Sequence, residues 1–179
     1  HDDYGDYSTN EPTMDGTASL TYYLSAMQKM GYTQSKAKKF SINHGAIVRT
    51  DKSKRQINLV FTGHEFADGY EIISKVLNTH KIKASFFFTG DFYRNKSYST
   101  LIKKLISEGH YLGAHSNKHL LYAAWQNRDS TLISKSGFIE DLKMNYEEMR
   151  KFGISADGAP FFFLLYEWYN TEISKWSDG

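Results

Sequence analysis

The sequence predicts an α/β protein in which short parallel strands alternate with helices. Two observations carry this prediction. Short apolar runs rich in aromatic and β-branched residues recur between Ile57 and Leu165, and segments with apolar residues at helical spacing separate them. Parallel strands need a crossover connection, and the crossover is usually a helix, so this alternation is typical of a parallel sheet covered by helices.

The strands are expected where apolar runs end in turn residues. The run Ile57-Asn58-Leu59-Val60-Phe61 is apolar and β-branched, as a buried parallel strand should be. A polar turn over 51–54 separates it from a preceding strand, and Thr89-Gly90 ends the Phe-rich strand that follows. The complete set of expected strands is 44–50, 56–61, 83–88, 111–114 and 161–165.

Helices are expected between the strands and ahead of the first one. Residues 19–30 have apolar side chains at helical spacing and end before Gly31, and Gly109 ends the helix expected over 98–108. The remaining expected helices are 34–40, 70–81 and 138–152. The side chains expected to face inward are Ile72, Ile73, Val76, Leu77, Leu101, Ile102, Leu105, Ile139, Leu142, Tyr146 and Met149. We therefore expect an N-terminal tail and helical extension over 1–43 and an α/β domain over 44–179.

Composition excludes several classes of function. Lys and Arg number 22 and Asp and Glu 20, so the formal charge of +2 does not suggest a nucleic-acid surface. The chain contains no cysteine, which excludes disulfides, thiolate metal sites and Cys nucleophiles. No apolar run reaches the ~18 residues that a membrane span needs. The start at His1-Asp2-Asp3 suggests a processed or trimmed chain.

Two histidines four residues apart follow the strand expected over 111–114. His115 and His119 lie in the run Gly113-Ala114-His115-Ser116-Asn117-Lys118-His119. Imidazole is a common zinc ligand, and catalytic zinc sites have three protein ligands and one open position. We interpret this pair as two of three ligands.

The third ligand should come from another strand end. The loop after the strand at 56–61 offers His64, Glu65 and Asp68, each a plausible ligand or catalytic base, and Thr89 to Asp91 follow the next strand. A structural alternative is that Glu65 or Asp68 only caps the helix beginning near Tyr70.

Two segments together resemble the NodB-like polysaccharide deacetylases, which form carbohydrate esterase family 4. Residues 83–90, Lys-Ala-Ser-Phe-Phe-Phe-Thr-Gly, resemble the family's Lys-Ala-Thr-Phe-Phe-x-x-Gly strand. Residues 108–119 resemble its motif Glu-Gly-His-x-Ile-Gly-x-His-Ser/Thr-x-x-His. The resemblance covers roughly residues 57–170.

The resemblance implies a distorted (β/α) barrel, a divalent metal and hydrolysis of N- or O-acetyl groups on a polysaccharide. Zinc is the usual metal, and cobalt or nickel would also suit these ligands. Carried over, His115 and His119 are the two His ligands. The resemblance also implies an acetylated polysaccharide or oligosaccharide as partner and a periplasmic or extracellular location. A non-catalytic glycan-binding relative is the alternative.

The family's acidic motif, Thr-Phe-Asp-Asp-Gly, is altered here. Anchoring the alignment on the strand at 59–61 puts His64 at the ligand position, whereas anchoring it on residues 66–69 makes Asp68 the ligand. The number of residues from Phe61 to Ala84 suits the alignment anchored on the strand better, which favours His64 as third ligand. Glu65 or Asp68 would then serve as base.

Two later motifs of the family also differ from this chain. Its Arg-Pro-Pro-Tyr-Gly motif matches only Tyr166, and we expect Tyr166, Glu167 and Trp168 to line the substrate groove. No counterpart of its last motif, which supplies a general acid, is present. We therefore expect an incomplete barrel, because a full one needs roughly 200 residues or more.

Overall fold

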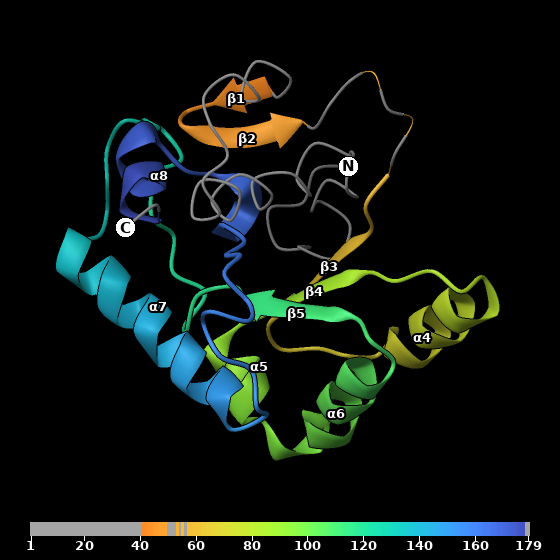
Figure 1. The fold of residues 1–179 in the computed structure, drawn as a ribbon. Coiled ribbons are helices and arrows are strands. Elements are labelled where there is room, and N and C mark those ends of the chain that lie inside the picture. Colours follow the sequence, from red (N-terminus) through yellow and green to blue (C-terminus); the bar gives the residue numbers. More distant parts are fainter. Residues whose placement is uncertain (1–40, 50–52, 54, 56, 178–179) are drawn as a thin grey trace, which may run out of the picture.

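The computed structural model describes residues 41–49, 53, 55 and 57–177. The helices expected over 19–30 and 34–40 lie outside these residues. The described chain forms a parallel three-stranded sheet with helices packed around it and a separate two-stranded hairpin (Figure 1).

The sheet consists of β3 (Val60–Gly63), β4 (Ser85–Phe88) and β5 (Tyr111–Ala114), in the order β3-β4-β5. Both pairings are parallel, and Ser85 stands opposite Val60 on one side and Tyr111 on the other. The predicted parallel α/β arrangement is confirmed. Since all three strands run the same way, the residues that follow them meet at one edge of the sheet.

Five α-helices accompany the sheet in the described part of the chain: α4 (Tyr70–Thr79), α5 (Gly90–Arg94), α6 (Ser99–Ser107), α7 (Lys135–Arg150) and α8 (Thr171–Ser177). Two short 3-10 helices are η2 (Lys96–Tyr98) and η3 (Leu165–Glu167). In Figure 1, α5 and α6 lie below the sheet and the hairpin lies above it. The helices expected over 70–81, 98–108 and 138–152 are confirmed to within a few residues.

Aromatic side chains fill much of the core. Phe86 and Phe88 on β4 are 4% exposed each, and Phe92 of α5 stacks on Phe88 with ring centroids 4.1 Å apart. On the other face of β4, Phe87 packs so tightly on β5 that a Cβ atom at Gly113 would lie 2.1 Å from its ring. Leu101, Ile102 and Leu105 are buried as predicted.

The inward faces predicted for two other helices are partly wrong. Ile72 and Val76 of α4 are 71% and 50% exposed, and Ile139 of α7 is 46% exposed. On α4 Leu77 is buried as predicted, and Ser74 is buried beside it, where its hydroxyl donates to the Glu108 carboxylate. Helical spacing identified the helix correctly but placed Ile72 and Val76 on the wrong side of it.

The strand expected over 44–50 begins two residues later, at Ala46, because a turn occupies His44 and Gly45. β1 (Ser41–Asn43) and β2 (Ala46–Arg49) pair with each other in an antiparallel hairpin. Its turn residues, His44 and Gly45, have φ of 45° and 84°. The expected domain boundary between residues 43 and 44 falls at this turn and stays a prediction. The following strand, expected over 56–61, begins later, at Val60.

The strand expected over 161–165 is reduced to a single bridge. Phe162 pairs with Ala114, and the Phe163 amide donates to the Ala114 carbonyl at 3.0 Å. The extended conformation stops at η3, where Tyr166 and Glu167 have φ of 54° and 51°. The helices α5 and α8 were not predicted. In the described residues no helix is long and apolar enough to cross a membrane.

Candidate active site

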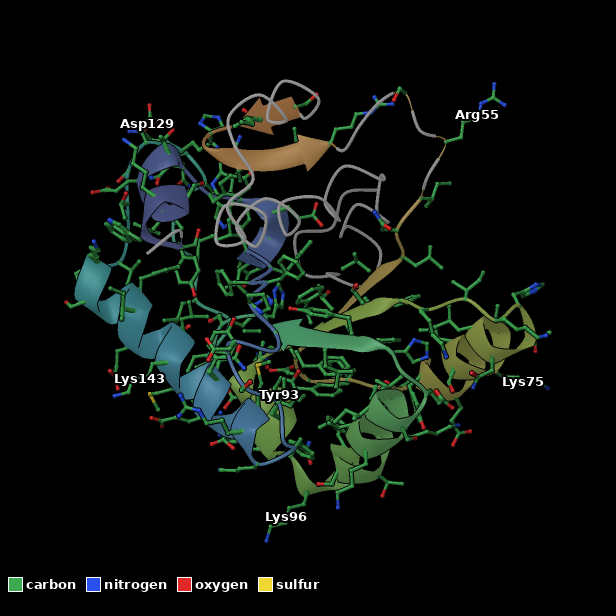
Figure 2. The ribbon with its side chains drawn as sticks, viewed as in Figure 1. Arg55, Lys75, Tyr93, Lys96, Asp129 and Lys143 are labelled. Atoms are coloured by element: carbon green, nitrogen blue, oxygen red, sulfur yellow. The ribbon has the colours of Figure 1, made fainter. Side chains whose placement is uncertain are left out.

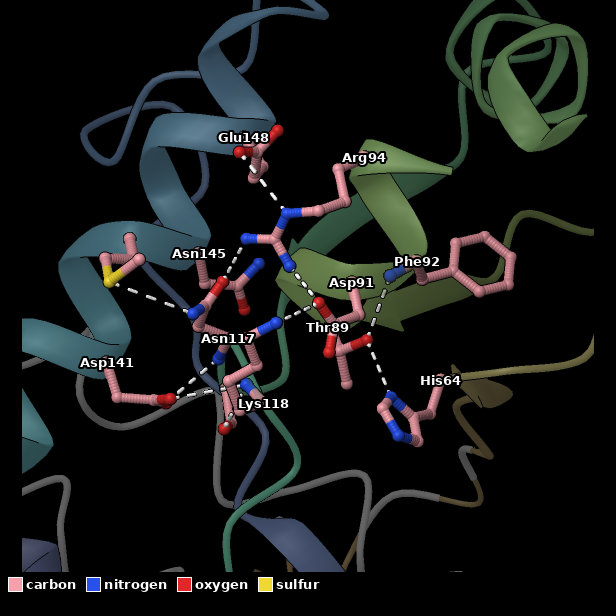
Figure 3. A network of polar contacts seen from close by, with 12 residues as sticks. His64, Thr89, Asp91, Phe92, Arg94, Asn117, Lys118, Asp141, Asn145 and Glu148 are labelled. Atoms are coloured by element: carbon pink, nitrogen blue, oxygen red, sulfur yellow. Dashed lines mark hydrogen bonds and ion pairs between the residues drawn. The ribbon is translucent and has the colours of Figure 1, made fainter. Parts of the chain in front are cut away.

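Three strand ends supply the candidate site. His64 follows β3 directly, Thr89 follows β4, and His115 follows β5. The Thr89 hydroxyl lies 3.1 Å from His64 Nδ1 and also accepts the Phe92 amide at 3.1 Å, which caps α5 (Figure 3). The parallel register therefore brings together segments that are far apart in sequence.

The three predicted histidine ligands lie together. The rings of His64 and His119 are stacked, with centroids 4.7 Å apart and planes 15° apart. The rings of His115 and His119 meet edge to face, with centroids 5.3 Å apart and planes 72° apart. His115 is 3% exposed, so the cluster runs from the interior toward partly open His64 and His119.

In each histidine a protein group occupies the Nδ1 atom. His115 Nδ1 lies 2.7 Å from the Phe163 carbonyl oxygen, and His119 Nδ1 lies 3.0 Å from the Tyr166 hydroxyl. A carbonyl can only accept, so His115 must donate from Nδ1, and its Nε2 then carries a lone pair. Holding one ring nitrogen in this way orients the other toward a metal in many metalloproteins.

The ring orientations allow a shared metal ion between His115 and His119, but not among all three histidines. A bound ion lies in the plane of each coordinating imidazole, at about 2.0–2.1 Å from zinc. The planes of His115 and His119 cross, which suits a shared ion, but the nearly parallel rings of His64 and His119 cannot both point at it. Accordingly, no three His, Asp or Glu side chains among the described residues converge on one metal position. The imidazole donors of His115 and His119 suit a divalent metal chemically, whereas His64 as placed does not share a position with them.

Burial keeps two of the histidines neutral. Burial lowers the pKa of His115 to about 3, with the neighbouring His119 as a second cause. Burial followed by the nearby His64 lowers the pKa of His119 to about 4. Near neutral pH both rings are therefore uncharged, which is the form that binds metals.

The two candidate bases differ in position. Glu65 Oε1 lies 3.7 Å from His64 Nε2, and the Glu65 side chain is 66% exposed. Asp68 is exposed, and within the described residues it makes no hydrogen bond or ion pair with the three histidines. Neither acid caps α4 through its side chain, because the N-cap is Gly69 and no side chain bonds there. The structure thus brings Glu65 to the cluster and leaves Asp68 apart.

Backbone strain is concentrated around the histidines. Ser116 and His119 have φ of 67° and 56°, and Tyr166 and Glu167 also lie in the left-handed region. This conformation is uncommon for residues other than glycine, and it tends to gather at functional sites. The loop from 115 to 119 and the segment at 166–167 are therefore held by their surroundings in unusual shapes.

An aromatic surface extends from His119. Tyr166 packs edge to face on His119, with centroids 4.7 Å apart, and on Trp125, with centroids 5.3 Å apart. Trp125 lies 5.7 Å from Trp168, whose ring is covered by the Arg128 guanidinium at 4.2 Å. Tyr166 and Trp168 were predicted, whereas Trp125, which is 50% exposed, was missed because only its ring contacts mark it.

Charged side chains labelled in Figure 2, such as Lys96 and Lys143, point away from the fold, whereas a polar network supports the loop from the side of α5 (Figure 3). Asp91 accepts from Lys118 at 2.7 Å and pairs with Arg94, whose Nε is 3.6 Å from Glu148. Burial alone would raise the pKa of Asp91, but Lys118 and Arg94 together bring it below its ordinary value. Asp91 is thus a charged partner of these cations and not a free base.

Comparison with known proteins agrees with this fold. The polysaccharide deacetylase family profile matches residues 49–158. The chain therefore belongs to the polysaccharide deacetylase family. An uncharacterised 30.6 kDa protein of Geobacillus stearothermophilus is 36% identical over 101 residues, which span 55% of this chain and 34% of that protein.

Solved structures of family 4 carbohydrate esterases have the same fold. A pseudoenzyme mutant with restored activity superposes with a TM-score of 0.57 and 18% identity, covering 70% of this chain and 42% of that one. A xylanase-linked domain from the hindgut metagenome of Trinervitermes trinervoides gives 0.53 and 19%, covering 65% and 51%. A wild-type pseudoenzyme of Bacillus anthracis gives 0.53 and 16%, covering 85% and 53%. The NodB-type (β/α) fold is confirmed, and the chain spans about a third to a half of these relatives.

Proposed function

We propose that this protein is a metal-dependent hydrolase that removes N- or O-acetyl groups from a polysaccharide. The observation that carries the proposal is the histidine cluster at the strand ends, in which every Nδ1 has a protein partner and the Nε2 atom of His115 is directed away from that partner. His115, His119 and, after a turn of its ring, His64 would hold the metal. Zinc suits these donors best, with cobalt or nickel as alternatives.

The metal would supply Lewis acidity toward the acetyl carbonyl and a more acidic water at neutral pH. The protein's own part begins with the base. Glu65 would accept the proton of the attacking water, since its carboxylate lies 3.7 Å from His64 Nε2. Because the Glu65 side chain is exposed, it has room to change rotamer. Asp68 is the second candidate, and it would need a larger movement of the loop after β3.

Substrate binding is proposed for the aromatic surface beside His119. Tyr and Trp rings stack on the apolar faces of sugars while their polar tips reach hydroxyl groups. Tyr166 and Trp168 would wall the groove, Glu167 would face its polar side, and Trp125 would extend it outward. An acetylated polysaccharide or oligosaccharide is the corresponding partner, encountered in the periplasm or outside the cell.

Acetate release tests this proposal. Zinc-loaded protein should release acetate from acetylated chitooligosaccharide or acetylated xylan, and a chelator should abolish release. Added zinc should restore it. Release that persists at full rate in chelator would contradict metal dependence, and no release from loaded protein on either substrate would contradict the hydrolase.

The second candidate is a glycan-binding relative without catalysis. It is favoured by the solvated position of Glu65 and the distance of Asp68 from the histidines, since an efficient base is usually held in place. Glycan binding without acetate release would identify this function.

A further inference from the structure

Helix α7 carries two buried polar side chains on its inner face. Asp141 is 6% exposed and Asn145 is 0% exposed, and they lie four residues apart, one turn of the helix. Neither has a place in the hydrolysis described above. Polar groups this deeply buried need hydrogen-bond partners, and those partners reveal their role.

Asn145 joins the ends of two strands. Its Oδ1 accepts the main-chain amide of His115 at 2.8 Å, and its Nδ2 donates to the Phe88 carbonyl at 3.3 Å. Phe88 is the last residue of β4, and His115 follows β5. The side chain therefore fixes the point at which the loop carrying the first histidine leaves the sheet.

Asp141 binds the same loop further along. Its Oδ2 accepts the Asn117 amide at 2.9 Å and the Tyr122 hydroxyl at 3.1 Å, and its Oδ1 accepts the Lys118 amide at 3.3 Å. Figure 3 shows Asp141 directed from α7 at the main chain of Asn117 and Lys118. A carboxylate is well suited here because it only accepts, and main-chain amides only donate.

These bonds lie on both sides of Ser116 and directly before His119, the two residues of the loop with positive φ. Ser116, with φ of 67°, lies between the amides of His115 and Asn117, and His119, with φ of 56°, follows Lys118. Backbone in this conformation persists only where the surroundings over-determine it. Three bonds from α7 to the main-chain amides of His115, Asn117 and Lys118 provide that constraint.

We propose that Asp141 and Asn145 are positioning residues, which hold the loop from 115 to 119 in the geometry that presents both histidines to a metal. The metal part rests on the proposed function, whereas the loop geometry does not. A role in packing alone would be served as well by apolar residues of similar size.

Metal affinity and amide exchange test the proposal in the folded protein. Asp141→Asn keeps the size of the side chain and removes its charge and one acceptor. We expect Co²⁺ affinity to fall about 10- to 100-fold, as for other residues that orient metal ligands. Amide hydrogen exchange should quicken at least 10-fold at Asn117 and Lys118. Glu140→Gln, on the neighbouring position with its side chain 61% exposed, is the matched control and should change neither quantity.

Asn145→Asp is the second variant, in case the first does not fold. It keeps the acceptor for the His115 amide and replaces the donor to the Phe88 carbonyl with a repelling oxygen. Because the Phe88 carbonyl also accepts the His115 amide at 3.2 Å, displacing that carbonyl should quicken exchange at His115, and we expect a similar loss of Co²⁺ affinity.

Two results would overturn the proposal. One is unchanged Co²⁺ affinity together with unchanged exchange at His115, Asn117 and Lys118 in folded variants. The other is a uniform rise in exchange along all of α7, which would mean loss of packing only. If the wild-type protein binds no Co²⁺, the proposed metal site fails, and the exchange measurement alone then decides the role of Asp141 and Asn145.

Discussion

The imidazole of His115 donates from Nδ1 to the carbonyl oxygen of Phe163 at 2.7 Å. The main-chain amide of Phe163 also donates to the Ala114 carbonyl. Phe163 therefore binds both the imidazole of His115 and the residue before it. This contact joins the loop after β5 to the segment leading to Tyr166. It also fixes the tautomer of His115 at a site where burial excludes the charged form.

Acid should destabilise the metal-free protein through His115. In the unfolded chain this residue takes up a proton below about pH 6.5. In the folded chain burial lowers its pKa to about 3, so the unfolded state binds more protons between these values and stability falls as pH falls. We expect a loss on the order of 2 kcal/mol between pH 7 and pH 4.5 by denaturant unfolding.

The control for this measurement is His115→Gln, which should remove the share of His115 and leave the shallower pH dependence that His119, with its pKa lowered to about 4, contributes in the same direction. His80→Gln, at an exposed position after α4, should leave it as in the wild type. An equally steep profile in His115→Gln would assign the acid sensitivity to other groups.

His64 should prove to be the third ligand by its effect on bound metal. Its ring is stacked on His119 and would have to turn before both could share one ion. If it does turn, His64→Ala should lower Co²⁺ affinity more than about 100-fold, beyond the effect of residues that only orient ligands. Equilibrium dialysis with His80→Gln as control measures this. Unchanged occupancy would remove His64 from the ligand set and reopen the assignment of Asp68.

Tyr166→Phe should weaken metal binding without unfolding the protein. The variant removes the hydroxyl that lies 3.0 Å from His119 Nδ1 and keeps the ring that packs on His119. We expect Co²⁺ affinity to fall about 10-fold, at the lower end for outer partners of ligands. The thermal midpoint should stay within a few degrees of the wild type. A fall in stability with unchanged affinity would mean that Tyr166 only packs.

The central sheet was predictable because its signals are local. The strand at 111–114 is found where the run of residues predicted it, and Leu101, Ile102 and Leu105 are buried as helical spacing required. Proximity of His64, His115 and His119 also followed from sequence, since parallel strand ends must meet at one edge.

Other features depended on contacts that the sequence does not display. The burial of Ser74 on α4 goes with its bond to Glu108, and the strand expected over 161–165 is a single bridge at Phe162, after which the chain turns at Tyr166. Asp141 and Asn145 resemble ordinary polar residues of a surface helix. Only the tertiary structure shows that they bind the loop from 115 to 119.

Gly113→Ala should destabilise the sheet without touching the histidines. A Cβ atom there would lie 2.1 Å from the Phe87 ring and 3.0 Å from the Phe161 carbonyl. Overpacking of this kind costs about 1–3 kcal/mol, measurable by denaturant unfolding. Gly69→Ala is the control, because its Cβ would meet only Ile73 at 3.7 Å. Equal stability of the two variants would show that Phe87 moves aside freely.

Trp125→Ala should separate glycan recognition from folding. The ring is 50% exposed and reaches His119 through Tyr166, so it is placed to stack on a sugar next to the one at the histidines. Aromatic contacts contribute about 0.5–1.5 kcal/mol beyond buried area, and a factor of ten in affinity is about 1.4 kcal/mol. We therefore expect binding of acetylated chitooligosaccharide to weaken about 3- to 10-fold by calorimetry, with or without metal. Leu132→Ala, 55% exposed, is the matched control and should bind as the wild type does. Equal binding by Trp125→Ala would show that the bound glycan extends from His119 in another direction.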